Sequence, residues 1–309
     1  MRRPDRGCHV RARGLFVGAT TVDLFYLVTT VPGPDEKMLA RRQLYAAGGP
    51  ATNAAVTFAW LGGEAWLLSG LGSHPTAAIA RHDLASFGVR HVDLWTDDEG
   101  PPDVSVILVT ASTGSRAIVS LPGSRGAGAG FVLDPALVRR CDVVLLDGYH
   151  LPTAIEVARV AASSRIPVVL DGGSWKPGLD DLLPHVSHAI CAERFRPPGC
   201  GTESESLAYL RAAGIAFRAV THGSRPIRYE DPGGGGEIAV PVVDPVVDTT
   251  GAGDVLHGAF CAYAREAWRD FAGALARAAE VASRSCGSFG TRAWIDAVAD
   301  RPGPKPGGG

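Results

Sequence analysis

Short apolar runs alternate with helical patterns along most of this 309-residue chain, and the alternation constrains the fold more than any other feature. Several runs are continuously apolar, which is typical of strands that are buried on both faces. Gly or Pro bounds each of the helical patterns between them. The predicted strands are 15–19, 65–72, 142–148, 167–173, 188–192 and 217–223, and the predicted helices are 50–62, 75–88, 151–164 and 203–214.

This repetition of strand, helix and strand predicts an α/β fold with a mostly parallel sheet that helices cover on both sides. Two segments interrupt it. "VSVILVTASTGSRAIVSLPG" at 104–123 predicts an antiparallel hairpin, and 22–47 is extended and irregular. We expect segments 22–47 and 97–123 to pair in a small sheet. That sheet would form a lid over the carboxyl ends of the parallel strands, where α/β sheets bind ligands.

One domain is expected over 13–300, preceded by a short tail at 1–12. "RPGPKPGGG" at 301–309 has nothing to bury, so we expect it to be disordered. "DPGGGGE" at 231–237 has the composition of a flexible hairpin loop.

The overall charge and the cysteines argue against several classes of protein. A formal net charge of -2 gives no electrostatic reason to expect a nucleic-acid partner or a membrane surface. The six cysteines are scattered without a CxxC pair, which is typical of reduced thiols. The basic N-terminus lacks the apolar core of a secretory signal, and no apolar run is long enough to span a membrane. We therefore expect a cytoplasmic protein.

The common catalytic motifs are missing. The sequence contains no GxxxxGK[ST] and no GxGxxG, which argues against a P-loop enzyme and against a fingerprinted Rossmann cofactor site. It also contains no GxSxG and no HExxH, which removes the simplest hydrolase interpretations.

"DTTGAGDVLHGAF" at 248–260 is the stretch that points to chemistry. Gly251, Ala252 and Gly253 allow a sharp turn whose N–H groups face one way, and a helix follows directly. A helix N-terminus of this kind binds anions, and phosphate is the ligand we expect there. Asp254 could then accept a proton from a hydroxyl that attacks phosphorus. The alternative is that Asp254 only caps the helix.

Two further stretches carry candidate ligand contacts. Gly48 and Gly49 precede a helix that Pro50 can begin, and Asn53 falls in its first turn, where its amide can face a ligand. Asp23 follows the first strand, in "VGATTVDLF". Each of these residues alone has an ordinary structural explanation as a turn former or a local hydrogen-bonding group.

Together these stretches resemble the ribokinase-like (PfkB) family of carbohydrate kinases, over about residues 13 to 300. The resemblance implies a three-layer α/β sandwich with a mostly parallel central sheet and a small β-sheet lid. It implies ATP as the phosphoryl donor, with Asp254 as catalytic base and the turn 251–253 as anion hole. Asp23, Gly49 and Asn53, with Gly48 beside them, match contacts to sugar hydroxyls.

The resemblance also implies a nucleotide site and metal sites. Thr221 and Gly223, in "VTHGSRPI", match the strand that contacts ATP, and Lys176 could reach its phosphates. Asp248 and Thr250 match positions that bind a monovalent cation in some members. From the ATP site we expect Mg²⁺ dependence, and from the cation positions we expect activation by K⁺.

The chain departs from the family pattern in three places. The N-x-x-E motif that organises Mg²⁺ is replaced by "ICAERFRPPG" at 190–199, where Glu193 could substitute. Pro226 replaces the second glycine of TxGxxG, and "GSHPTA" stands in place of GDDxxG. The stretches 170–178 and 282–292 look closer to the ketohexokinase and sulfofructose kinase branches than to ribokinase.

The function expected from the sequence is transfer of the γ-phosphoryl group of ATP to a sugar hydroxyl. One alternative is a nucleoside kinase, in which Phe25, Tyr26 or Tyr45 would stack on the base. The other is a ligand-binding protein without catalysis. Lys37, a rare lysine in the first lid segment, is expected to favour a ketose with an acidic group. By analogy with the family, the lid could pair two chains in a homodimer.

Overall fold

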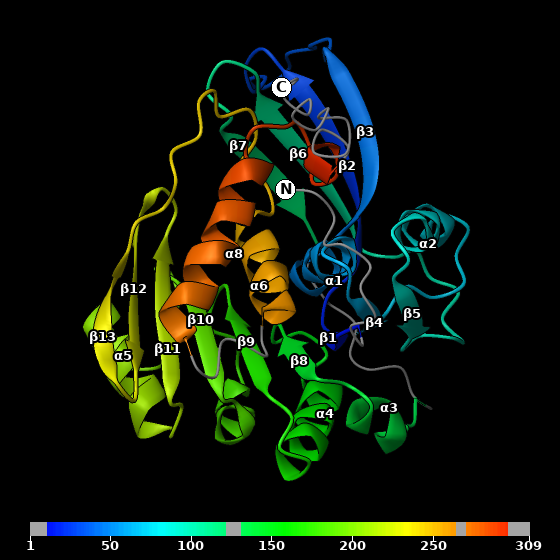
Figure 1. Ribbon diagram of the computed structural model, residues 1–309. Coiled ribbons are helices and arrows are strands. Elements are labelled where there is room, and N and C mark those ends of the chain that lie inside the picture. The colour runs from blue at the N-terminus through cyan, green and yellow to red at the C-terminus, as the bar shows by residue number, and fades with distance from the viewer. Residues whose placement is uncertain (1–10, 122–130, 264–269, 296–309) are drawn as a thin grey trace, which may run out of the picture.

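The computed structural model describes residues 11–121, 131–263 and 270–295. Two β-sheets and the helices around them make up this part of the chain (Figure 1). Most of the predicted N-terminal tail and all of the predicted C-terminal tail lie outside the described residues. None of the helices in these ranges has the length and apolar character needed to span a membrane.

The larger sheet has nine strands in the order β13-β12-β11-β10-β9-β8-β1-β4-β5. All pairs of neighbouring strands from β11 to β5 are parallel, and only the pairs β11–β12 and β12–β13 are antiparallel. The mostly parallel sheet is therefore confirmed. Its strands are β1 (Arg13–Val17), β4 (Glu64–Ser69), β5 (Arg90–Asp93), β8 (Val143–Leu146), β9 (Val168–Gly172), β10 (His188–Ala192), β11 (Phe217–His222), β12 (Arg225–Asp231) and β13 (Gly234–Ile238).

Helices cover both faces of this sheet. Successive side chains of a strand point to opposite faces, so each central strand packs against both helical layers. On β8, Val143 and Leu145 pack into the core beneath one helical layer, and Val144 and Leu146 pack into the core beneath the other. The first layer holds α1 (Pro50–Trp60), α2 (Ala77–Ser86), α6 (Ala252–Ala262) and α8 (Phe271–Ser285). The second holds α3 (Pro135–Arg139), α4 (Leu151–Ser163) and α5 (Glu203–Ala212), with the 3₁₀ turns η1 (Leu179–Asp181) and η2 (Leu183–His185).

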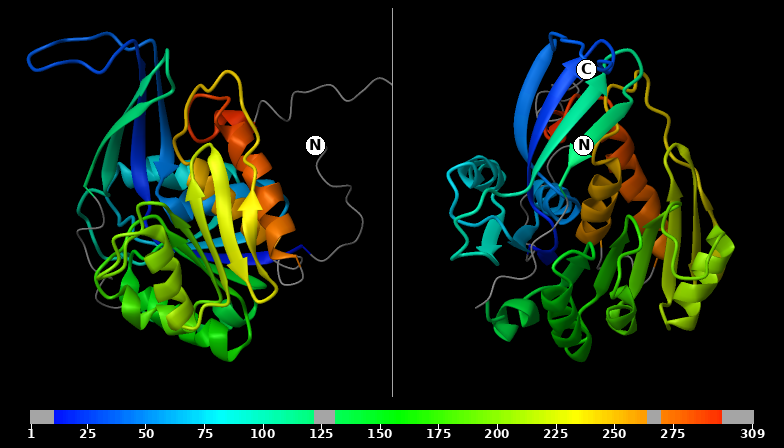
Figure 2. Two further views of the ribbon diagram at one scale, coloured as in Figure 1. Left: turned by 90° about the vertical axis from the view of Figure 1, so that its left-hand side faces the viewer. Right: turned by 180° about the vertical axis from the view of Figure 1, so that it is seen from behind.

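The two irregular segments of the sequence do form a separate small sheet, with the order β3-β2-β6-β7. Its strands are β2 (Thr21–Val28), β3 (Arg42–Gly48), β6 (Val104–Thr110) and β7 (Arg116–Ser120). Segment 22–47 is less irregular than expected, since only 29–41 lies outside strands. Figure 2 shows this loop extending beyond the sheet.

A small apolar core ties the lid to the main domain. It consists of Phe25, Ala46, Ile107 and Val109 from the lid, together with Phe289, which follows α8. The rings of Phe25 and Phe289 meet edge to face with centroids 6.2 Å apart. The lid is therefore anchored by the loop that follows α8 as well as by its own strands.

The prediction of a flexible loop at 231–237 is wrong for most of its length. Only Pro232 and Gly233 separate β12 from β13, and the following glycines pair with β12 through backbone hydrogen bonds, which need no side chain. The ring of Tyr229 lies against Gly236, 3.1 Å from where a Cβ would stand, and covers the bare backbone. The edge strand is therefore ordered despite its composition.

Candidate active site

The signature turn opens α6 as the sequence predicts. Gly251 is the N-cap residue with φ 74°, a left-handed conformation that favours glycine. The capping alternative for Asp254 is not supported. Among the described residues no side chain caps this helix, and Asp254 lies in its first turn with its carboxylate directed at α1. The Ala252 N–H makes only a long 3.4 Å hydrogen bond to the Thr249 carbonyl, so this N-terminus suits an anionic ligand.

Asn53 and Asp254 meet across the two helices. The Asn53 Nδ2 atom donates to Asp254 Oδ2 at 2.8 Å, although the residues are 201 positions apart. Gly258 permits this approach of α6 to α1, because a Cβ there would stand 2.3 Å from the Ala54 carbonyl oxygen. The structure therefore brings the predicted sugar contact and the predicted base together.

The glycine pair before α1 has a steric explanation. A Cβ on Gly48 would stand 2.0 Å from the Asp23 carboxylate, and one on Gly49, where φ is 100°, would stand 2.2 Å from the Ala19 carbonyl oxygen. Asp23 is buried and accepts a 2.6 Å hydrogen bond from the Thr21 hydroxyl. Burial raises the pKa of Asp23, and the Thr21 hydrogen bond opposes the rise.

Arg292 completes this side of the site, and sequence reasoning missed it. Its Nη1 donates to Asn53 Oδ1 at 2.9 Å and to the Thr291 carbonyl at 3.2 Å. Its Nη2 donates to the Ala47 carbonyl at 2.6 Å, and its Nε donates to Asp83 Oδ2 at 3.1 Å. All three guanidinium nitrogens are engaged. An arginine in the short "GTR" stretch was the available signal, but all its partners except Thr291 lie more than 200 residues away.

Two buried carboxylates lie beside Asp254 at the carboxyl ends of neighbouring strands, and neither was predicted. Asp171 is the penultimate residue of β9, and its Oδ2 lies 3.2 Å from His257 Nδ1. Asp147 follows β8 and accepts the backbone N–H groups of Ala19 at 2.9 Å and Ala51 at 3.2 Å. Aspartates at two adjacent strand ends were a readable signal, since parallel strands converge on the ligand edge.

Burial and these neighbours raise the pKa of Asp254 well above the usual value of an aspartate. Burial, followed by the negative charge of Asp171, raises the pKa of Asp254 to about 7. The hydrogen bond from Asn53 and the ring of His257 lower it, and Asp147 raises it further. A carboxylate with a pKa near neutral is suited to general-base catalysis.

Lys176 lies beside Asp147. Its Nζ donates to the Asp147 carbonyl at 2.9 Å and stands 4.5 Å from the centre of the Tyr149 ring. The contact places Lys176 at the end of β8, three strands from β11, where the predicted nucleotide residues lie. Its assignment to ATP phosphates stays a prediction.

The predicted nucleotide residues cluster at the ends of β10 and β11. Glu193 N donates to the Thr221 carbonyl at 3.1 Å, and Gly223 follows with φ 68°. The Glu193 carboxylate is paired with Arg225. Arg225 thus offsets part of the negative charge that a metal ion would need, and the assignment of Glu193 to Mg²⁺ stays a prediction.

Asp248 and Thr250 lie just before the signature turn. Asp248 is buried, and its two oxygens accept the N–H groups of Thr250 at 2.8 Å and Gly290 at 2.9 Å. Among the described residues, the buried Thr250 hydroxyl has no hydrogen-bond partner. Oxygen atoms of this kind suit a hard cation, and the monovalent-cation site stays a prediction.

Lys37 is not brought to the site. It is exposed in the loop 29–41, beyond the outer end of β2. The six residues from Asp23 to Val28 span five steps, or roughly 17 Å at about 3.3 Å per residue, and Lys37 follows in the loop beyond them.

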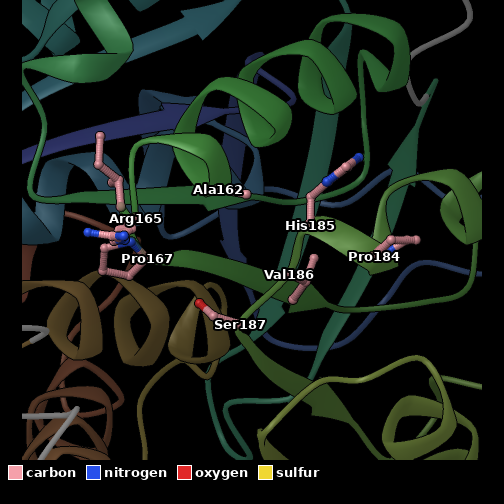
Figure 3. Close-up of a pocket in the computed structure, with 8 residues that line it drawn as sticks. Ala162, Arg165, Pro167, Pro184, His185, Val186 and Ser187 are labelled. Carbon is pink, nitrogen blue, oxygen red and sulfur yellow. The ribbon is translucent and has the colours of Figure 1, made fainter.

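A pocket of about 500 Å³ lies at the opposite end of the strands (Figure 3). It is lined by residues that immediately precede β9 and β10, among them Pro167 and Ser187. Ligands of parallel sheets bind at the carboxyl ends, so this pocket is separate from the candidate site.

Comparison with known proteins agrees with the fold and identifies the family. The model of the pfkB family carbohydrate kinase matches residues 13–297. The ribokinase of Bacillus subtilis (strain 168) is 27% identical over 287 residues, which cover 89% of this chain and 93% of that protein. The ATP-dependent ribose-1-phosphate kinase of Halopiger xanaduensis is 28% identical over 251 residues, covering 81% and 84%. The structure of Arabidopsis thaliana ribokinase complexed with ribose and ATP superposes with a TM-score of 0.72 at 22% identity, covering 95% and 100%.

Proposed function

The chain belongs to the pfkB family of carbohydrate kinases, and from this premise we propose that it transfers the γ-phosphoryl group of ATP to a hydroxyl group of a sugar. The single observation that carries the proposal is the contact of Asn53 with Asp254 at the N-terminus of α6. It brings a candidate base and an amide that could bind a hydroxyl to a helix N-terminus that no described side chain caps.

In the proposed reaction, Asp254 accepts the proton of the sugar hydroxyl as its oxygen attacks the γ-phosphorus. The N–H groups of the turn 251–253 and the positive end of the α6 dipole stabilise the charge that develops on the transferred group. Asp23 and Asn53 hold the sugar. Mg²⁺ enters with ATP as part of the substrate, held mainly by its phosphates.

The chemical class of the sugar is open to a direct test. One relative is named a ribose-1-phosphate kinase and another a ribokinase, which supports a pentose, with or without a phosphate. The ketose with an acidic group, expected from Lys37 and from the stretches 170–178 and 282–292, stays a second proposal. Lys37 could contact the sugar only if its loop bends inward or reaches a second copy of the chain.

A nucleoside acceptor is less well supported, because the aromatic residues of the lid are poorly placed for it. Phe25 is fully buried in the lid core. Tyr26 and Tyr45 share the other face of the sheet, where both phenol oxygens accept from Gln43. Asp23 faces the Phe25 side, since side chains alternate along a strand.

The test is a phosphotransfer screen with purified protein, MgATP and a panel of pentoses, pentose phosphates, neutral and acidic ketoses, and adenosine. A kinase predicts ADP release that depends on one of these acceptors. If no acceptor releases ADP above the background of ATP hydrolysis, while ATP or an acceptor still binds, the alternative of a ligand-binding protein is favoured. The cytoplasmic location stays a prediction, which cell fractionation would check.

A further inference from the structure

The side-chain amide of Asn53 lies between two groups of opposite hydrogen-bonding character. Arg292 carries only donors, so the atom that faces it must be the Asn53 oxygen. The ionised carboxylate of Asp254 only accepts, so the atom that faces it must be the Asn53 nitrogen. The two contacts require the same orientation of the amide.

Arg292 is itself held from several directions. Its side chain is 12% exposed and forms an ion pair with Asp83, whose Oδ2 also accepts the Ala47 N–H at 3.0 Å. The Ala47 carbonyl in turn accepts from Arg292. A planar guanidinium with this set of partners cannot rotate without breaking several hydrogen bonds, so its contact with Asn53 is fixed.

We propose that Arg292 is a positioning residue, which locks the Asn53 amide so that its NH₂ group always faces Asp254, and so keeps the catalytic carboxylate ionised near neutral pH. The inference deepens the proposed function and rests on it only where it treats Asp254 as the base.

The charges around Asp254 explain why such a lock is needed. Asp147 and Asp171, from the strand ends, oppose ionisation of Asp254, as burial does. His257 on its own helix and Asn53 on α1 favour ionisation. A hydrogen bond favours the charged form of a carboxyl group only while the partner presents a donor.

Without Arg292, the Asn53 amide could turn over and present its oxygen to Asp254. That oxygen accepts a hydrogen bond from the protonated carboxyl group and therefore stabilises the protonated form. The base would then be neutral at higher pH. Since only the ionised form accepts a proton, activity would be lost first at low pH and would recover at high pH.

The experiment compares Arg292→Met, Arg292→Lys and wild type, with Arg284→Met as matched control. Arg284 lies on α8, its side chain is 48% exposed, and within the described ranges its guanidinium pairs only with Glu280, in an i,i+4 contact at 3.9 Å. Two quantities are measured between pH 5 and 9.5: kcat/KM for the best acceptor, and the ¹³C shift of the Asp254 carboxyl group in aspartate-labelled protein, assigned with Asp254→Asn.

The proposal predicts that Arg292→Met moves the acidic limb of kcat/KM and the ¹³C titration upward by about one pH unit. Turnover then falls about tenfold at pH 6 and matches wild type above pH 9. Arg292→Lys, which keeps the charge, shifts less, and Arg284→Met does not shift. Equal loss at every pH with an unchanged ¹³C titration would show a purely structural role and overturn the proposal.

Two features keep the outcome decisive. If Arg292→Met does not fold, Arg292→Lys still carries the test, because a lysine cannot reproduce the fork that holds both Asn53 and Asp83. The ¹³C titration needs no substrate. If wild type phosphorylates nothing but the titration shifts in the variants, the proposed function fails and the positioning role stands.

Discussion

Single residues determine the chemistry of this site, and Asp254 has the most specific role among them. Its carboxylate lies between acids on two strand ends and an amide on α1, at the N-terminus of α6, which no described side chain caps. We predict that Asp254→Asn lowers kcat by about 10²–10⁴-fold, the usual cost of losing a general base. Calorimetry should show ATP binding nearly unchanged. Turnover within about threefold of wild type would remove Asp254 from the mechanism.

The pH dependence follows from the same residue. Because the pKa of Asp254 is raised to about 7, the ionised base is depleted below neutrality. We expect kcat/KM of wild type to fall about tenfold for each pH unit below about 7 and to reach a plateau above it. A profile that stays flat down to pH 5 would contradict the assignment.

The cation site offers a second measurement at this scale. If a K⁺ ion bound by Asp248 and Thr250 stiffens the anion hole, then kcat should be higher in potassium than in sodium buffer at equal ionic strength. We predict that Asp248→Asn abolishes this difference. Identical rates of wild type in the two buffers would remove K⁺ from the proposal.

Some site residues could be predicted from sequence because their chemistry is local. The turn 251–253 and the pair Gly48–Gly49 are read from backbone requirements within a few residues. The role of Arg292 could not be predicted in this way, since Asn53, which it holds, lies 239 positions away. Nothing within its own segment indicates that partner.

At the scale of elements, the site depends on how closely α6 approaches α1. We predict that Gly258→Ala destabilises the protein by about 1–3 kcal/mol, the usual cost of overpacking, because its Cβ would collide with the Ala54 carbonyl. It should also lower kcat by displacing Asn53 from Asp254. Thermal denaturation and steady-state rates measure the two effects.

Gly201→Ala is the matched control for this variant. A Cβ at Gly201 would meet only the Glu205 carboxylate, at an ordinary distance of 3.7 Å. It should leave both stability and rate close to those of wild type. If Gly258→Ala behaves in the same way as the control, the close approach of the two helices does not position the site.

Elements with a continuous apolar run or a bounded helical period were predictable from sequence, and all six predicted strands and four predicted helices are present with small shifts of their ends. β13 was not predicted, because its glycines pair through backbone alone. The first lid segment was predicted only as extended chain. Its regular strand β2 depends on pairing with β6, which lies about 80 residues further along the chain.

At the scale of the whole molecule, the outer face of the lid exposes large apolar and aromatic side chains through which two chains could associate. Val119 on β7 is 75% exposed and Tyr45 on β3 is 53% exposed. The strand pairings place both on one face of the small sheet, at its two edge strands. We predict a dimer formed through this face, with twice the 32.2 kDa mass of the chain in sedimentation equilibrium. Val119→Lys should shift the equilibrium toward the monomer.

The control for the dimer is Val242→Lys, because Val242 is 94% exposed and lies outside both sheets. It introduces the same charge elsewhere on the surface and should leave the dimer intact. A wild-type chain that sediments as a monomer at all concentrations tested would rule out the dimer.

The contact of Arg292 with Asn53 has a consequence for synthesis of the chain. The residues are 239 positions apart, and every strand of both sheets precedes Arg292. At about 5–20 residues per second, a ribosome takes roughly 12–48 seconds to pass from the first to the second. During that interval a nascent chain can complete both sheets while its active site still lacks one side. We therefore expect a chain that stops between the end of α8 and residue 292 to contain every strand of the two sheets and yet lack the side chain that holds Asn53.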